Sequence, residues 1–358
     1  MTEPLQPDPD GPALVAPLGT GQPDDLTYYA FAGSNAPEPA RPSAPSGFST
    51  MPDVLAGRYC IERLLGAGGM GAVYRARDLL AEQYGDPDPY VALKVLNEDF
   101  AESPDASAVL YSEFCLTRYL RHDNVLRVHG FHVDTACERA FITMELMRGL
   151  TLDKLLCERP LGLPWKELRH IALPLLDALA YAHACGIVHG DIKPSNVMLS
   201  EKGVRLFDFG LGRAEEGVLP GLPHLSRERF NAWTPGYAAP ELLEQRKLSA
   251  RADLYAVACV IFELASGKHP FHHLPSTQAR DEHLDVGLQA PVRLPKRCWP
   301  ALRTALAFDP GARTITAGKM RDAFTGTSSW PWCRKIRPAW REKLAAEAGP
   351  TDWTQSKL

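Results

Sequence analysis

Apolar and polar positions divide the chain into an irregular start, a strand-like stretch and a helical stretch. Residues 1–50 show no regular hydrophobic period and hold ten of the 31 prolines. Such a segment buries too little apolar surface to offset its chain entropy. The sequence therefore predicts a disordered, Pro-rich tail over residues 1–55, followed by an ordered region.

The strand-like stretch begins near Arg58, where short runs of β-branched and aromatic residues alternate with polar ones. A glycine-rich turn separates the first two runs, and a polar loop containing Pro and Gly precedes the third. One helix is expected between the third and fourth runs, over Val109–Leu120. The predicted strands are Tyr59–Leu65, Ala72–Asp78, Tyr90–Leu96 and Ala140–Leu146.

Helical periodicity dominates after Gly149. One long helix should end near Gly186 and bend at Pro174, because proline disrupts the backbone ladder. Its apolar face is formed by Leu168, Ile171, Leu175 and Leu179. A second, strongly apolar helix is predicted over Ala250–Ser266, closed by Gly267. Strands followed by helices predict an α+β protein with two lobes.

Composition and charge narrow the function classes. The 358 residues are 45% hydrophobic, with a net charge of −4. Residues 1–50 carry six acids against one arginine, so the remainder is nearly neutral and offers no basic field for nucleic acid. Eight cysteines are scattered without a CxxC pair, which is typical of reduced core residues.

No transmembrane segment is expected from the sequence. The longest apolar stretch, Leu254–Ala265, is too short to span a bilayer and contains Glu263. The N-terminus lacks the basic-then-apolar order of a signal peptide. A cytoplasmic protein is therefore predicted.

A glycine-rich turn, Gly66–Val73, fits the pattern GxGxxGxV. Any tight turn uses glycine, so the pattern alone is weak evidence of nucleotide binding. Strand-type residues follow it, whereas a dinucleotide-binding turn opens a helix. A glycine hairpin of this kind lets backbone N–H groups approach phosphates.

Lys94 stands between Leu93 and Val95 in an apolar strand. It is either an edge-strand lysine facing solvent or an ammonium held in a cleft to pair with phosphate oxygens. The glycine hairpin upstream favours the second interpretation. Glu113, on the following helix, is the best candidate partner, although by itself it also fits a solvated helical charge.

The strongest signal is the segment Val188–Leu199, which supplies Asp191, Lys193 and Asn196; Asp208 follows shortly after it in a DFG triplet. Phosphoryl transfer needs a carboxylate to orient the attacking hydroxyl and take its proton. It also needs a cation to neutralise the moving phosphoryl group, and a carboxylate and an amide oxygen to hold Mg²⁺.

These motifs, in this order, resemble those of the protein-kinase family, specifically the bacterial serine/threonine kinases of eukaryotic type. The resemblance runs from about Arg58 to about Phe324, and implies a kinase domain over 56–325 with an antiparallel-sheet N-lobe (about 56–147) and a mainly helical C-lobe (about 148–325). Residues 326–358 form a Trp-rich tail. The matching segments are the third-strand motif VALK, HGDIKPSN, DFG, TPGYAAPE and the helix Ala250–Ser266.

The resemblance implies a role for each matching residue. Asp191, Lys193, Asn196, Lys94 and Glu113 would be catalytic, and Asn196 and Asp208 would hold Mg²⁺, with Mn²⁺ as an alternative. Met144 would be the gatekeeper behind the adenine. ATP would be bound by Leu65, Gly66, Gly68, Gly69, Gly71, Val73, Ala92, Lys94, Met144, Glu145, Met147, Met198 and Asp208. Asp253 would anchor the catalytic loop, and Arg313 would pair with Glu241.

The chain departs from the family pattern at two places. Gly190 precedes Asp191 where many kinases carry the arginine that binds a phosphorylated activation loop. We therefore expect the dephosphorylated enzyme to keep most of its activity. Trp233 and Ala238 replace the commoner Gly and Met near the peptide-docking surface, so substrate preferences of the family do not transfer there.

Lys193 and Thr234 together favour serine and threonine hydroxyls of proteins as substrates, because tyrosine kinases place other residues in this loop. Autophosphorylation is expected at Ser226, Thr234 or the N-terminal tail, with a metal-dependent phosphatase as an opposing partner. Two alternatives are a pseudokinase and a small-molecule kinase. The first normally lacks Lys94, Asp191 or Asp208, and the second generally lacks the TPGY…APE segment.

Overall fold

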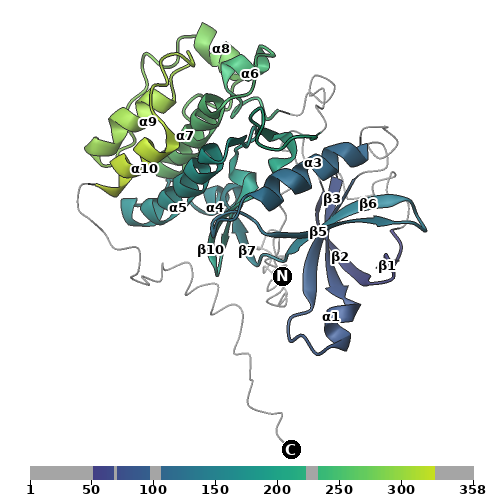
Figure 1. The fold of residues 1–358 in the computed structure, drawn as a ribbon. Coiled ribbons are helices and arrows are strands. Elements are labelled where there is room, and N and C mark those ends of the chain that lie inside the picture. The colour runs from purple at the N-terminus through teal and green to yellow at the C-terminus, as the bar shows by residue number, and fades with distance from the viewer. Residues whose placement is uncertain (1–50, 68–70, 97–105, 223–232, 327–358) are drawn as a thin grey trace, which may run out of the picture.

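The computed structural model describes residues 51–67, 71–96, 106–222 and 233–326. The chain forms a strand-rich lobe and a mainly helical lobe (Figure 1), so the predicted α+β bilobal class is confirmed. Several sequence predictions lie outside the described residues. They concern most of the N-terminal tail, the tail after Gly326, Gly68, Gly69 and Ser226.

A six-stranded antiparallel sheet forms the first lobe, in the order β1-β2-β3-β4-β6-β5. All four predicted strands are present, with boundaries that differ by no more than two residues. The bounds are β1 Val54–Leu55, β2 Tyr59–Ala67, β3 Gly71–Asp78, β4 Tyr90–Leu96, β5 Val128–Asp134 and β6 Arg139–Glu145. Because β4 lies between β3 and β6, its lysine is not on a sheet edge.

Two helices accompany this sheet. Helix α3 (Ala106–Tyr119) buries Val109, Leu110 and Phe114 towards the sheet and extends towards the helical lobe (Figure 1). Helix α1 (Leu79–Gln83) stands where the sequence predicted only a polar loop. It begins because the Asp78 carboxylate accepts hydrogen bonds from the backbone N–H groups of Leu80 and Ala81.

The second lobe packs around two long helices, α5 (Trp165–Ala184) and α7 (Ala250–Ser266). Helix α5 continues through Pro174, and the bend expected there stays a prediction. Gly186 and Gly267 have φ of +70° and +74°, so both predicted helix ends are confirmed. The other helices are α4 Leu152–Glu158, α6 Pro240–Leu243, α8 Ser276–Asp281, α9 Trp299–Ala305 and α10 Ala317–Thr325, with 3₁₀ turns η2 Pro194–Asn196, η3 Phe209–Leu211 and η5 Lys296–Cys298.

Two small sheets lie where the lobes meet, and they hold the polar loops. Strands β7 (Gly149–Thr151), β9 (Val197–Ser200) and β10 (Gly203–Leu206) form the first, and β8 (Ile187–Val188) pairs with β11 (Arg213–Ala214) in the second. The segment from Val188 to Arg213 is therefore paired at both of its ends, because Val188 in β8 lies opposite Arg213 in β11. This arrangement restricts the loops that carry Asp191 and Asp208.

Among the described residues, no helix is long and apolar enough to cross a membrane. The seven cysteines in the described part of the chain are all unpaired thiols. The expectation that they are core residues holds only for Cys259 and Cys298, because Cys157 is exposed and the other four are half-buried.

Candidate active site

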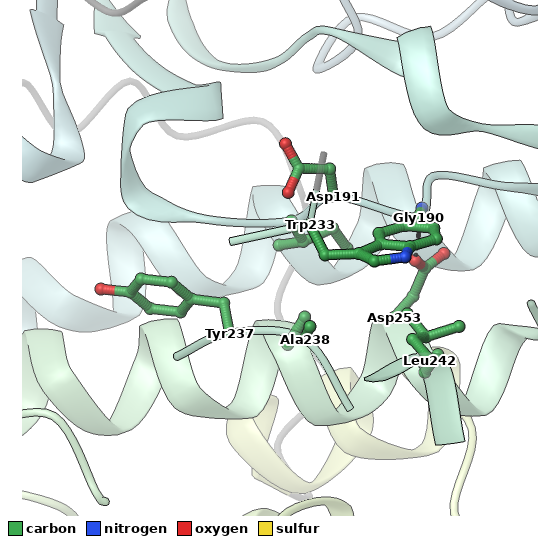
Figure 2. Close-up of a pocket in the computed structure, with 10 residues that line it drawn as sticks. Gly190, Asp191, Trp233, Tyr237, Ala238, Leu242 and Asp253 are labelled. Atoms are coloured by element: carbon green, nitrogen blue, oxygen red, sulfur yellow. Dashed lines mark hydrogen bonds between the residues drawn. The ribbon is translucent and has the colours of Figure 1, made fainter. Parts of the chain in front are cut away.

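The loop after β8 is fixed by a buried carboxylate on α7. Asp253 accepts hydrogen bonds of 2.8 Å from the backbone N–H groups of His189 and Gly190, and its Oδ2 lies 2.8 Å from His183 Nε2. Figure 2 shows Asp253 beneath Gly190, the residue that precedes Asp191. The anchoring predicted for Asp253 is therefore present in the geometry, and it sets the direction in which the loop leaves β8.

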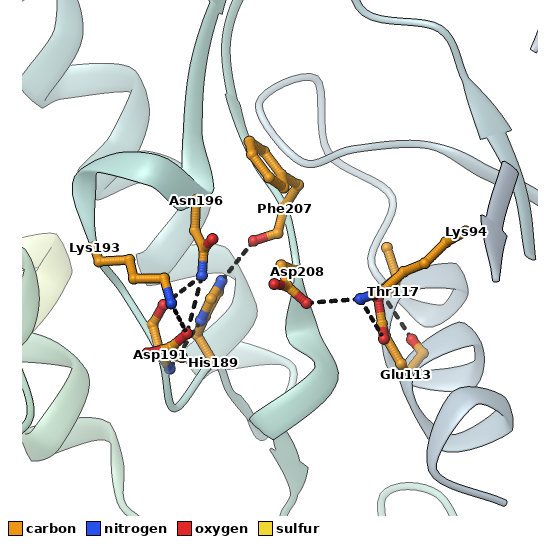
Figure 3. Close-up of polar contacts among 9 residues, drawn as sticks. All are labelled: Lys94, Glu113, Thr117, His189, Asp191, Lys193, Asn196, Phe207 and Asp208. Carbon is orange, nitrogen blue, oxygen red and sulfur yellow. Dashed lines mark hydrogen bonds and ion pairs between the residues drawn. The ribbon is translucent and has the colours of Figure 1, made fainter. Parts of the chain in front are cut away.

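Asp191, Lys193 and Asn196 converge within that loop (Figure 3). Lys193 Nζ lies 2.8 Å from Asp191 Oδ2 and donates to Thr234 Oγ1 at 3.0 Å. The Asn196 side-chain amide donates to the Asp191 backbone oxygen at 2.8 Å and to its Oδ2 at 3.2 Å. The Asp191 carboxylate is thus held by a cation and an amide, with 10% of its side chain exposed.

Lys94 joins two carboxylates from different parts of the chain. Its Nζ donates to both oxygens of Glu113, at 2.7 and 2.8 Å, and to Asp208 Oδ1 at 2.9 Å (Figure 3). Only 6% of the Lys94 side chain is exposed, so neither this lysine nor Glu113 is a solvated surface charge. The cleft interpretation of Lys94 is the one that the geometry supports.

The charge states in this cluster follow from burial and proximity. Burial by itself would lower the pKa of Lys94, but the carboxylates of Asp208 and Glu113 outweigh it, so the net pKa is raised. Burial would raise the pKa of Asp208, but the Lys94 ammonium, with smaller contributions from Lys193 and His189, lowers it on balance. Lys94 is therefore a cation and Asp208 an anion at neutral pH.

A strained turn presents Asp208 to the cleft. Asp208 has φ +67° and ψ +67°, a left-handed conformation that is uncommon for residues other than glycine. Gly210 follows in η3, and a Cβ on it would lie 3.1 Å from Glu113 Oε2. The DFG triplet therefore suits this turn, because a larger residue at Gly210 would press on the Lys94–Glu113 pair.

The predicted nucleotide wall forms one apolar cluster. It contains all six apolar residues that the sequence assigned to ATP, together with two that the sequence did not identify, Leu126 and Phe207. The six are Leu65, Val73, Ala92, Met144, Met147 and Met198. Leu126 and Phe207 can be assigned to this cluster only from their contacts in the structure, because in the sequence each looks like an ordinary core residue.

The remaining predicted nucleotide residues lie around this cluster. Gly66 and Gly71 belong to β2 and β3, on either side of the predicted glycine turn. A Cβ on Gly71 would lie 2.4 Å from the Val95 backbone oxygen, so the hairpin requires glycine there. Glu145 is the last residue of β6, and its side chain accepts a hydrogen bond from the backbone N–H of Arg127. The role predicted for Glu145 in ATP binding therefore concerns its backbone.

His189 is a further supporting residue that sequence reasoning missed. It is fully buried, its Nε2 lies 2.9 Å from the Phe207 backbone oxygen, and its Nδ1 accepts from the Asp191 N–H. The side chain therefore joins the loop of Asp191 to the strand that leads to Asp208. Its place within VHGD was the only available sequence signal.

Comparison with known proteins agrees with this geometry. Residues 59–317 match the model of the protein kinase domain. The chain belongs to the protein kinase family. Its kinase domain resembles that of the serine/threonine-protein kinase PkaA of Streptomyces coelicolor, with 32% identity over 72% of this chain and 47% of the relative. The serine/threonine-protein kinase PknA of Mycobacterium tuberculosis is 31% identical over 75% of this chain and 61% of the relative.

A solved structure supports the same placement. The kinase domain of Mycobacterium tuberculosis PknI aligns with a TM-score of 0.53 and 26% identity, over 79% of this chain and 98% of that one. The resemblance to bacterial serine/threonine kinases of eukaryotic type is thereby confirmed. The kinase domain accounts for about half the length of the curated relatives, so what those whole proteins do is not transferred by likeness alone.

Proposed function

We propose that this kinase domain transfers the γ-phosphate of ATP to serine or threonine hydroxyls of proteins, its own chain included. The observation that carries the proposal is that the cluster of Lys94, Glu113 and Asp208 lies beside the pair of Asp191 and Asn196, with His189 linking the two loops (Figure 3). These groups supply the cation, the metal ligands and the proton acceptor that the reaction needs. The catalytic unit is proposed to span residues 56–325 and to act in the cytoplasm.

The polar groups of the cleft fit a magnesium nucleotide. Asn196 uses its side-chain N–H groups on Asp191, which leaves its amide oxygen turned to the side of Asp208 (Figure 3). A carboxylate and an amide oxygen are hard ligands of the kind that Mg²⁺ takes alongside phosphate oxygens and water, and Mn²⁺ accepts the same set. No cluster of three or more His, Cys, Asp or Glu side chains suited to a metal occurs among the described residues.

The nucleotide would lie between the glycine hairpin and the apolar cluster, with adenine against Val73, Ala92 and Met198. The hairpin N–H groups near Gly66 and Gly71 and the Lys94 ammonium would bind phosphate oxygens. Glu113 would keep Lys94 in place for this contact. Bound Mg²⁺ would supply charge neutralisation at the phosphates.

Each remaining residue of the cleft has a part in the transfer. Asp191 accepts a hydrogen bond from the substrate hydroxyl, orients it and receives its proton. A bond forms between that hydroxyl oxygen and the γ-phosphorus, and the bond to the bridging oxygen breaks, so that ADP leaves with the electron pair. Lys193 neutralises charge on the moving group, and Thr234 holds Lys193 on the side where a peptide would lie.

One assay separates a protein kinase from the two alternative functions. Purified protein is incubated with γ-labelled ATP and Mg²⁺, alone and with a generic basic protein, and phosphoamino acids are then identified. The proposal expects label on serine and threonine of protein, and none when the metal is removed by a chelator. A pseudokinase would label nothing, and a small-molecule kinase would leave protein unlabelled. Label on tyrosine would contradict the substrate class.

Replacement of Lys94 by Met should lower the rate of transfer at least about 100-fold, because positioned charges supply most of the catalysis. The variant also leaves Glu113 and Asp208 without their shared cation. Rates are compared with those of Lys202→Met, which removes an exposed lysine from a turn of the helical lobe. Equal activity of the Lys94 variant and the wild type would exclude the assigned role.

Phosphatase treatment should leave more than about half of the activity. Gly190 provides no guanidinium to bind an activation-loop phosphate, so loss of that phosphate removes no contact at this position. Initial rates are measured directly after removal of the phosphatase, and mass spectrometry verifies the phosphorylation state. A decrease of about tenfold or more would show that a phosphate contact elsewhere controls the enzyme.

A further inference from the structure

Trp233 occupies an unusual position next to the catalytic loop. Its half-buried side chain packs against the hydrophobic core of the helical lobe. It lines a small enclosed space together with Gly190, Asp191, Leu242 and Asp253. Figure 2 shows the indole beside Gly190 and above Asp253, between the catalytic loop and α7.

The backbone at Gly190 leaves no room for a side chain. Gly190 has φ +85°, and a Cβ on it would lie 2.6 Å from the Leu211 backbone oxygen and 3.0 Å from Leu248 Cδ2. The position directly before Asp191 is therefore without a side chain, and Trp233 lines the same small space as Gly190. The indole thus lies beside the catalytic loop (Figure 2).

The residue after Trp233 contacts the proposed catalytic groups directly. Thr234 Oγ1 accepts from Lys193 Nζ at 3.0 Å and lies 3.5 Å from Asp191 Oδ1. On its other side, the Thr234 backbone oxygen accepts from the N–H groups of Tyr237 and Ala238, each at 3.0 Å. Thr234 is therefore placed by a hydrogen-bonded turn that follows it and by the packed indole that precedes it.

We propose that Trp233 is a positioning residue that holds Thr234 against Lys193 and Asp191, so that the described residues 233–238 stay aligned through packing of the indole beside Gly190. This inference rests on the proposed kinase function. Removal of the indole lets Thr234 move away from Lys193, which disturbs the peptide-facing side of the site. The nucleotide side, formed by Lys94, Glu113 and Asp208, keeps its contacts.

The primary test compares Trp233→Ala with Trp233→Phe and with Trp299→Ala. Trp299 also packs half-buried against the core of the helical lobe, at the start of α9, and therefore controls for loss of core packing alone. We expect Trp233→Ala to lower kcat/KM for a peptide at least about tenfold, because positioning contributes strongly to transfer. Its affinity for a magnesium-bound ATP analogue, measured by calorimetry, should stay within about twofold of wild type.

Trp233→Phe separates the effect of an aromatic ring at this position from the effect of losing side-chain volume. Trp233→Phe keeps an aromatic ring and should retain at least about a third of the wild-type kcat/KM. Trp299→Ala should change kcat/KM by less than about twofold, even if it lowers thermal stability as much as Trp233→Ala. If Trp233→Ala does not fold, Trp233→Leu replaces it in the same comparison.

A double-mutant cycle provides a readout that loss of stability would not change. If Trp233 acts through Thr234, Trp233→Ala should have almost no further effect on kcat/KM in a Thr234→Ala background. Independent, multiplicative effects of the two substitutions would overturn the inference, as would a Trp233→Ala enzyme with wild-type kcat/KM. In both cases the wild-type protein still phosphorylates peptides, so the proposed function stands. If the wild-type protein labels no protein, the function fails and the inference falls with it.

Discussion

We expect Asp191→Asn to phosphorylate protein substrates at least about 100-fold more slowly than the wild-type enzyme. The amide has almost the same size and can still contact Asn196, but it cannot receive the proton of the attacking hydroxyl. It also removes the ion pair of 2.8 Å between Asp191 and Lys193. The rate is measured with γ-labelled ATP and a saturating peptide, so that kcat is obtained separately from KM.

The control for this variant is Asp285→Asn, which removes one exposed negative charge from the helical lobe. It should keep the wild-type rate, and both variants should bind a magnesium-bound ATP analogue normally. Because the contacts of Lys94 with Glu113 and Asp208 are unchanged by this substitution, normal nucleotide affinity shows that the loss lies in the transfer step. A fully active Asp191→Asn enzyme would remove the proton acceptor from the mechanism.

The largest effect on stability is expected at the buried pair of Glu241 and Arg313. Arg313 is 1% exposed and donates to both Glu241 oxygens at 2.6 and 2.9 Å. It also donates to three backbone oxygens, those of Ala307, Phe308 and Arg251. Glu241→Ala leaves this guanidinium without its counter-charge, and should lower the free energy of unfolding by about 3–5 kcal/mol.

An exposed pair one turn away provides the comparison. Glu244 and Arg280 form an ion pair of 2.5 Å in which both side chains reach solvent. Glu244→Ala should therefore cost no more than about 1 kcal/mol. Urea unfolding followed by circular dichroism measures both values. Equal costs for the two substitutions would show that burial does not govern the contribution of Glu241.

The sequence could indicate that Asp191, Lys193 and Asn196 lie together because this motif is local. Asp191, Lys193 and Asn196 lie within six residues of one another, and a short loop necessarily keeps them close. Glu113 was harder to assign, because no residue pattern distinguishes a buried helical glutamate from a solvated one. The family resemblance selected it, and the contact of Lys94 with both Glu113 oxygens agrees with that selection.

Features that depend on packing between distant segments could not be predicted from the sequence. Leu126 and Phe207 join the nucleotide wall only because the chain brings β6, β9 and the segment before η3 together. Helix α1 depends on a single Asp78 cap within a stretch rich in loop-forming residues. Trp233 was recognised as a departure from the family, but its contact with the region of Gly190 could be found only in three dimensions.

The Lys94 ammonium has a mechanical consequence for the whole molecule. It is attached to β4 and α3 through Glu113 on one side and to the DFG turn through Asp208 on the other, at 2.9 Å. A rotation that moves the sheet away from the helical lobe would lengthen the contact between Lys94 and Asp208 and leave the Asp208 carboxylate without this counter-charge, while Lys94 keeps Glu113. The relative position of the two lobes is therefore coupled to a single buried ion pair.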